Sequence, residues 1–144
     1  MLNVNDLLKT KGKQVWCLEY NASLGDAIKL LAEKGVGAVP VVKENKLIGI
    51  FSERDYVHNS AKNGAPPLDT PVTELMTSKV YIVKPTCTIE ECMLIMTDRH
   101  LRHLPVLEKN RIVGIVSIGD VVKGIISAQK DTIHQLEDYI QGKW

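Results

Sequence analysis

Apolar and polar residues follow one order along the first half of the chain and repeat it in the second half. A short stretch rich in β-branched and aromatic residues comes first and predicts a strand. Apolar residues three and four apart then predict an amphipathic helix, two further apolar stretches predict a pair of strands, and a second helix follows. The expected strands are 15–18, 38–42 and 47–51 in the first half, and 80–83, 103–107 and 112–116 in the second.

Local signals mark the ends of these elements. Ser23 and Thr88 are expected to cap the first helix of each half, and Thr88 with Glu91 has the spacing of a capping box. The segments KEN and EKN each end in an asparagine that suits a tight hairpin turn. We expect the last helix of each half to start after Ser52 or Ser117.

The two halves are copies of one unit. Residues 15–57 align without a gap with residues 80–122, at a constant offset of 65 positions. Each unit, at roughly 45–60 residues, is too small to bury its apolar face alone. We therefore expect a mixed α/β (α+β) fold of two βαββα half-domains that pack on each other with pseudo-twofold symmetry.

A stretch rich in proline and glycine separates the two units. It predicts a linker at 62–71, between a first unit with an N-terminal helix at 1–61 and a second unit with a C-terminal helix at 72–144.

Two apolar features lie outside the repeat. They are the pair Leu7 and Leu8 near the start, and the stripe of Ile133, Leu136 and Ile140 on one face of the last helix. Because two closed units do not obviously need this surface, it predicts a homodimer assembled through the terminal helices. A last helix that folds back on its own chain as a cap is the competing interpretation.

The seven-residue motif near the end of each unit carries the candidate chemistry: GIFSERD at 49–55 and GIVSIGD at 114–120. The simplest interpretation is a capping box, in which the serine and the aspartate only start a helix. That does not explain a glycine inside a strand, which costs roughly 0.5–1 kcal/mol relative to alanine and often marks close approach of a ligand or another backbone. A helix N-terminus favours phosphate, and an aspartate can accept hydrogen bonds from ribose hydroxyls. Both interpretations can hold together.

The duplicated βαββα unit, the two motifs and the strands VPVV and LPVL resemble a tandem pair of CBS domains, the Bateman module. The segments SERDY, ELMT, RHLPV and TIHQLEDYIQG make the chain similar to small stand-alone bacterial proteins of that family. The resemblance covers nearly the whole chain. It implies regulation rather than chemistry, through binding of adenosine-containing ligands (AMP, ADP, ATP, NAD(H) or S-adenosylmethionine) in two clefts between the half-domains.

The resemblance also implies roles for individual residues. Asp55 and Asp120 match the family's ribose-binding aspartate, and Ser52 and Ser117 match its hydroxyl contact near the ribose or phosphate. The positions that match the adenine slot are Val36, Ala38, Ile50, Val80 and Ile115.

Basic residues are placed differently in the two units. Arg54, Arg102 and His103 are candidate phosphate contacts. Gly119 is the counterpart of Arg54, and Gly37 with Ala38 stands where the second unit has its basic pair, so the two clefts cannot be equivalent.

Composition narrows the choice of function. Eighteen basic and 17 acidic residues give a net charge of +1, without the electrostatic footprint of a nucleic-acid or anionic-membrane binder. No stretch resembles a signal peptide or a spanning helix, so we expect a cytoplasmic protein. The cysteines and histidines lack metal-ligand spacing, and no nucleophile, base and orienting group occur together, so we expect no metal, no catalytic cofactor and no enzyme.

The sequence leaves three functions to be tested. The leading one is a non-catalytic energy or redox sensor that binds AMP, ADP, ATP or NAD(H) and regulates an unknown partner, for instance an enzyme. The alternative is an interaction scaffold whose nucleotide sites are vestigial. A nucleotide hydrolase is the third, and product formation in a turnover assay would reveal it.

Overall fold

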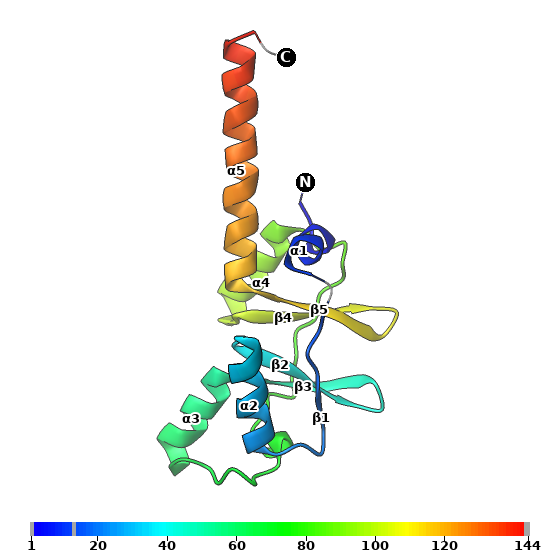
Figure 1. Cartoon of the computed structure of the whole chain (residues 1–144), viewed down its shortest axis with the longest axis vertical. Coiled ribbons are helices and arrows are strands. Elements are labelled where there is room, and N and C mark those ends of the chain that lie inside the picture. Colours follow the sequence, from blue (N-terminus) through cyan, green and yellow to red (C-terminus); the bar gives the residue numbers. More distant parts are fainter. Residues whose placement is uncertain (1, 13, 143–144) are drawn as a thin grey trace.

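The structure is a computed structural model that describes residues 2–12 and 14–142. The first unit and the segments around it contain α1 (Val4–Lys11), β1 (Leu18–Glu19), α2 (Leu24–Lys34), β2 (Ala38–Lys43), β3 (Lys46–Ser52) and α3 (Glu53–Asn63). A short 3-10 helix, η1 (Val72–Glu74), precedes the second unit, which contains α4 (Ile89–Arg99), β4 (His103–Glu108), β5 (Arg111–Ser117) and α5 (Ile118–Ile140). The predicted mixed α/β fold of two units is confirmed (Figure 1).

An antiparallel hairpin is the centre of each unit. In β2–β3, Val41 pairs with Gly49, and in β4–β5 Val106 pairs with Gly114, so the two registers match at the offset of the repeat. The turns are Glu44–Asn45 and Lys109–Asn110, and all four of these residues have positive φ. Two such residues in a row are the signature of the tight turn that suits the twist of a hairpin, as the sequence predicts.

The first predicted strand of each unit is much shorter than expected. Of the predicted strand 15–18, only Leu18 pairs with β2, in parallel, together with the next residue, Glu19. The predicted strand 80–83 makes a single bridge, between Val83 and Val106. The aromatic residues of these two segments, Trp16 and Tyr81, lie instead beside two clefts between the units.

The segment that precedes each unit in the sequence packs into the core of the other unit. Val72 and Leu75 pack into the core of the first unit, around Phe51. Helix α1, grouped with the first unit by its place in the sequence, packs into the core of the second unit through Val4, Leu7 and Leu8. The expectation that Leu7 and Leu8 remain available to a partner chain is therefore wrong, because both are buried within the chain itself.

The strand glycines mark where these segments come closest. A Cβ on Gly114 would meet the side chain of Leu8 at 2.5 Å, and a Cβ on Gly49 would meet Met76 Sδ at 2.5 Å and the Thr77 carbonyl at 2.9 Å. The close neighbours of these glycines are therefore parts of the same chain.

Side-chain caps start the long helices of both units. The predicted caps Ser23, Ser52, Thr88 and Ser117 are all N-cap residues whose side chains accept from the backbone N–H three positions on. The capping box predicted for Thr88 is only half formed. The Glu91 carboxylate instead accepts from the Cys87 thiol, at 3.3 Å.

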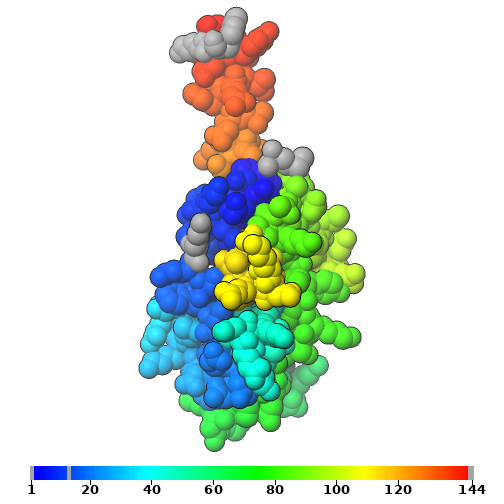
Figure 2. Space-filling model, turned by 90° about the vertical axis from the view of Figure 1, so that its right-hand side faces the viewer, coloured from blue at the N-terminus to red at the C-terminus, as the bar shows by residue number. Residues whose placement is uncertain are grey.

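Helix α5 extends far beyond the body of the molecule (Figures 1 and 2). Its 23 residues correspond to about 35 Å. Near its C-terminus the apolar residues Ile133, Leu136 and Ile140 are 55%, 58% and 82% exposed. Within the described residues, no helix combines the length and apolar character needed to cross a membrane.

We expect Gly49→Ala to lower the free energy of unfolding by about 1–3 kcal/mol, because the new methyl group would overlap a backbone carbonyl that cannot move independently. Gly119→Ala is the matched control, since its Cβ would meet only Ser117 Oγ at 3.6 Å and alanine favours a helix. Urea denaturation measures both. A Gly49→Ala protein as stable as the wild type would contradict the packing described here.

Candidate functional site

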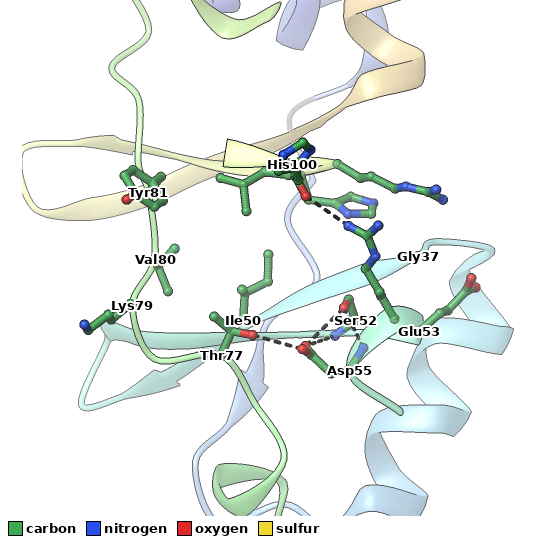
Figure 3. A pocket seen from close by; sticks show the side chains of 14 residues that line it. Gly37, Ile50, Ser52, Glu53, Asp55, Thr77, Lys79, Val80, Tyr81 and His100 are labelled. Atoms are coloured by element: carbon green, nitrogen blue, oxygen red, sulfur yellow. Dashed lines mark hydrogen bonds between the residues drawn. The ribbon is translucent and has the colours of Figure 1, made fainter. Parts of the chain in front are cut away.

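A cleft lies between the two hairpins, where the start of α3 faces the end of α4 (Figure 3). This first cleft is a cavity of about 170 Å³. Eight of the residues singled out in the sequence line it: Gly37, Ile50, Ser52, Arg54, Asp55, Val80, Arg102 and His103. Six further residues complete the lining: Glu53, Thr77, Lys79, Tyr81, His100 and Leu101.

Asp55 sits at the polar end of the first cleft and has two sets of partners. Its Oδ2 accepts from the Ser52 backbone N–H at 2.9 Å and from Ser52 Oγ at 3.1 Å, which closes the capping box of α3. Its Oδ1 accepts from Thr77 Oγ1 at 2.9 Å (Figure 3). All these donors are neutral, and within the described ranges Asp55 has no ion-pair partner. The cap therefore fixes a carboxylate whose second oxygen is held only by a hydroxyl.

Apolar side chains line the interior of the first cleft. Ile50 from β3 and Val80 from the extended segment before α4 project into the space between the hairpins (Figure 3). Leu101 and Tyr81 add apolar and aromatic surface from the second unit. The cleft thus combines an apolar slot with one fixed carboxylate.

Basic side chains also line the first cleft. Arg54 Nη1 donates to the His100 carbonyl at 2.9 Å, so the guanidinium of α3 spans the cleft to the end of α4 (Figure 3). Arg102 is a second arginine in the lining, and Lys79 lies on the other side of the cleft (Figure 3). The two arginines make the cleft suitable for an anion.

His103 contributes to the first cleft as a neutral group. Burial and the charges of Lys11 and Arg102 lower the pKa of His103 more than Asp120 raises it. The imidazole is therefore uncharged at pH 7 and can exchange hydrogen bonds with a ligand, but it does not add the positive charge expected from its place beside Arg102.

A second cleft occupies the position related to the first by the repeat. It is a cavity of about 380 Å³ lined by three predicted residues, Val36, Ala38 and Ile115, together with Lys11, Gly12, Gln14 and Trp16. The offset of 65 relates Trp16 to Tyr81, Gln14 to Lys79 and Ile115 to Ile50. Even the flanking charges correspond, because Lys34 lies 3.9 Å over the Trp16 ring and Arg99 lies 5.0 Å over the Tyr81 ring.

The two remaining predicted residues, Ser117 and Asp120, do not line this cavity; they follow Ile115 in the chain, at the start of α5. Asp120 Oδ2 accepts from the Ser117 backbone N–H at 2.8 Å, which repeats the capping box of α3. The same oxygen accepts from Lys11 Nζ at 2.7 Å. Burial raises the pKa of Asp120, but the hydrogen bonds from Lys11 and Ser117 lower it by more, so it lies below its usual value.

The residues that sequence reasoning missed fall into two kinds. Lys79 and Tyr81 flank Val80, and Trp16 follows from Tyr81 by the offset, so the repeat itself could have found them. Thr77 and Lys11 have no such signal, since each reaches its aspartate only because a distant segment is packed beside the hairpin.

The side chains that line the two clefts can bind a ligand. Metal ligands and a nucleophilic thiol are the other groups to consider. Within residues 2–12 and 14–142, no group of three or more His, Cys, Asp or Glu side chains is placed to hold a metal ion. Burial, the first of several causes, raises the pKa of Cys87 to about 12, so this thiol is protonated and is a poor nucleophile.

Comparisons with known proteins match this architecture. The family model of the CBS domain matches residues 4–62 and again residues 72–127. The CBS domain-containing protein CBSX3, mitochondrial, of Arabidopsis thaliana is 35% identical, over 96% of this chain and 72% of its own length. A solved structure of a putative signal-transduction protein with CBS domains from Burkholderia ambifaria is 41% identical and has a TM-score of 0.82, over 88% of this chain and 96% of that one.

Two further solved structures contain adenosine compounds. The CBS domain protein PAE2072 from Pyrobaculum aerophilum is complexed with AMP; it is 25% identical, with a TM-score of 0.73 over 83% of this chain and 89% of that one. The CBS domain pair of protein MJ0100, in complex with 5'-methylthioadenosine and S-adenosyl-L-methionine, is 25% identical, with a TM-score of 0.78 over 89% and 98%. With two matched domains that cover most of its length, the chain belongs to the CBS domain family.

Proposed function

We propose that the chain is a non-catalytic regulatory module that binds an adenine nucleotide in its first cleft and acts as an energy or redox sensor. The observation that carries the proposal is the pairing of Asp55, a fixed carboxylate with only neutral donors, with an apolar slot on one side and arginines on the other. AMP, ADP, ATP and NAD(H) share the base, ribose and phosphate that these three regions fit.

Each part of the ligand has a place in this proposal. The base enters between Ile50 and Val80, where burying apolar surface stabilises it. A ribose hydroxyl replaces Thr77 as donor to Asp55 Oδ1, because one hydroxyl can take the place of another with little loss. The phosphate lies near the N-terminus of α3, within reach of Arg54 and Arg102.

The solved relatives support the adenosine part of this proposal. AMP, 5'-methylthioadenosine and S-adenosyl-L-methionine, the compounds in those complexes, have adenosine in common. Of the three, AMP alone carries a phosphate. The preference of this chain for a phosphorylated ligand therefore rests on its own Arg54 and Arg102.

Arg54 also connects the ligand to the relative position of the two units. Its hydrogen bond to the His100 carbonyl joins α3 of the first unit to the end of α4 in the second. A bound phosphate competes for the same guanidinium and releases that carbonyl. Nucleotide occupancy then changes a direct contact between the units, which is what a regulatory module requires.

The proposal includes a homodimer that forms in the cytoplasm through α5, with an enzyme or other protein as the regulated partner. The exposed stripe of Ile133, Leu136 and Ile140 continues into an apolar groove at the base of α5 that Ile89, Ile125 and Ile133 help to line. A second copy of the chain fits this surface because a twofold contact pairs the same apolar stripe with itself.

We expect wild-type protein to bind AMP, ATP or NADH, and Asp55→Ala to weaken that binding about 10- to 150-fold, the value of a hydrogen bond to a charged group. Isothermal titration calorimetry measures both. Asp26→Ala is the matched control, because Asp26 closes an equivalent capping box with Ser23 at the start of α2 but does not line either cleft. A wild-type protein that binds none of these nucleotides supports the scaffold alternative instead.

We expect Arg54→Ala to weaken binding of AMP more than binding of adenosine, because it removes a charge that faces the phosphate and leaves the apolar slot intact. The dissociation constant of adenosine divided by that of AMP, measured by competition, should fall about tenfold or more. Arg111→Ala, on an exposed residue that lines neither cleft, should leave the ratio unchanged. An equal loss for both ligands would show that the substitution damages the cleft itself.

We expect wild-type protein to sediment at twice the mass of one chain, and the variant Leu136→Glu/Ile140→Glu to sediment as a folded single chain, because carboxylates are costly to bury in an apolar seam. His134→Glu/Gln135→Glu adds two carboxylates to the opposite side of α5 and should leave the dimer intact. A wild-type protein that is monomeric at tens of micromolar contradicts the assembly.

A further inference from the structure

The two clefts are equivalent in backbone position, yet their aspartates have different partners. In the first cleft, Asp55 accepts only from neutral groups, the last of them the Thr77 hydroxyl. Beside the second cleft, Asp120 forms an ion pair at 2.7 Å with Lys11, which lines that cleft. The lysine ammonium therefore lies against the carboxylate to which the proposed ribose would have to donate.

Lys11 makes two contacts with the second cleft. Its Nζ donates to Asp120 Oδ2 and, at 2.9 Å, to the carbonyl oxygen of Ile115. Both acceptors belong to the repeated motif, and Ile115 is the counterpart of Ile50 in the first cleft. One ammonium group thus contacts one oxygen of the carboxylate and an adjacent backbone acceptor together.

The position of Lys11 is fixed by helix packing. It is the last residue of α1, and the same helix buries Leu7 and Leu8 in the core of the second unit. Leu8 packs directly over Gly114, in the strand that ends at Ser117. A helix anchored on this strand therefore holds the ammonium at the end of the same strand.

The contact is strong enough to compete with a ligand. The side chains of Lys11 and Asp120 are 34% and 19% exposed, so water screens the pair less than a surface salt bridge. The lysine and the carboxylate are oppositely charged, whereas a ribose hydroxyl brings no charge of its own to the same carboxylate. The lysine also belongs to the same chain, so its effective concentration at the site is in the millimolar range or higher.

The second unit and the first differ in the basic residues that a phosphate would need. Gly119 stands where the first cleft has Arg54, and Gly37 and Ala38 stand where it has Arg102 and His103. The second cleft's cavity of about 380 Å³ leaves space for a ligand. Nucleotide binding in the second cleft is therefore limited by its polar groups and not by the size of its cavity.

We propose that Lys11 is a built-in occupant of the second cleft, which takes the place of a ligand's ribose and restricts each chain to one adenine nucleotide, bound in the first cleft. This inference rests on the proposed function, because it assigns the same ribose-binding role to Asp55 and Asp120. Lys11 thus determines how many nucleotides each chain binds.

Calorimetric titration with AMP, repeated with adenosine, tests the proposal through the number of sites per chain. We expect one site in the wild type and two in Lys11→Met, the second of which disappears in Lys11→Met/Asp120→Asn. Lys11→Gln, which keeps a polar side chain of similar length, is a second variant in case methionine disturbs the fold. Lys9→Met, on an exposed residue of the same helix, is the matched control and should keep one site.

Asp55→Ala separates this proposal from the function on which it rests. In the Lys11→Met/Asp55→Ala variant, one Asp120-dependent site should remain even though the first cleft is disabled. Two sites in the wild type, or a single site in both folded Lys11 variants, would overturn the role of Lys11 while the proposed function stands. Tighter binding in the wild type than in Lys11→Met at an Asp120-dependent site would also overturn it, since Lys11 would then be a ligand contact. Absence of binding to every variant would overturn both.

Discussion

The capping box at the start of α3 and α5 is the interaction on which both clefts depend. In each unit the strand of the hairpin runs directly into a helix, and the serine at the junction exchanges hydrogen bonds with the aspartate three residues on. This exchange satisfies donors that the first turn of a helix would otherwise leave unpaired. It also fixes the aspartate at the edge of the space between the units. One local arrangement therefore starts the helix and positions the candidate binding group.

The exchange of connecting segments makes the two clefts different. The chain before each unit crosses to the core of the other side of the molecule, so η1 packs with the first unit and α1 packs with the second. Beyond η1, the chain presents Thr77 to Asp55, a neutral donor that a ligand hydroxyl can replace. At the end of α1, it presents Lys11 to Asp120, a charged donor that a hydroxyl replaces poorly. The asymmetry thus arises from which residue each crossing segment places beside the aspartate.

Each cleft is also connected to a different part of the molecule. The first cleft is spanned by Arg54, which joins the two units through the His100 carbonyl. The second lies at the start of α5, the helix whose far end carries the exposed apolar stripe (Figure 1). A change in the first cleft therefore acts on the contact between the units, and the ion pair in the second cleft holds α1 against the base of the projecting helix.

The sequence by itself determined the features that depend on residues close together in the chain. The order of elements, the two hairpin turns and the four N-caps follow from periodicity and from hydrogen bonds between residues at most a few positions apart. The repeated motifs also indicated candidate residues for the clefts, and the structure brings eight of them together in the first cleft. Only the tertiary structure decided which core buries Leu7 and Leu8, how short the first strand of each unit is, and which side chain pairs with each aspartate. Lys11 and Asp120 are 109 positions apart, and a flexible lysine finds its partner according to how α1 packs on β5, which no local pattern specifies.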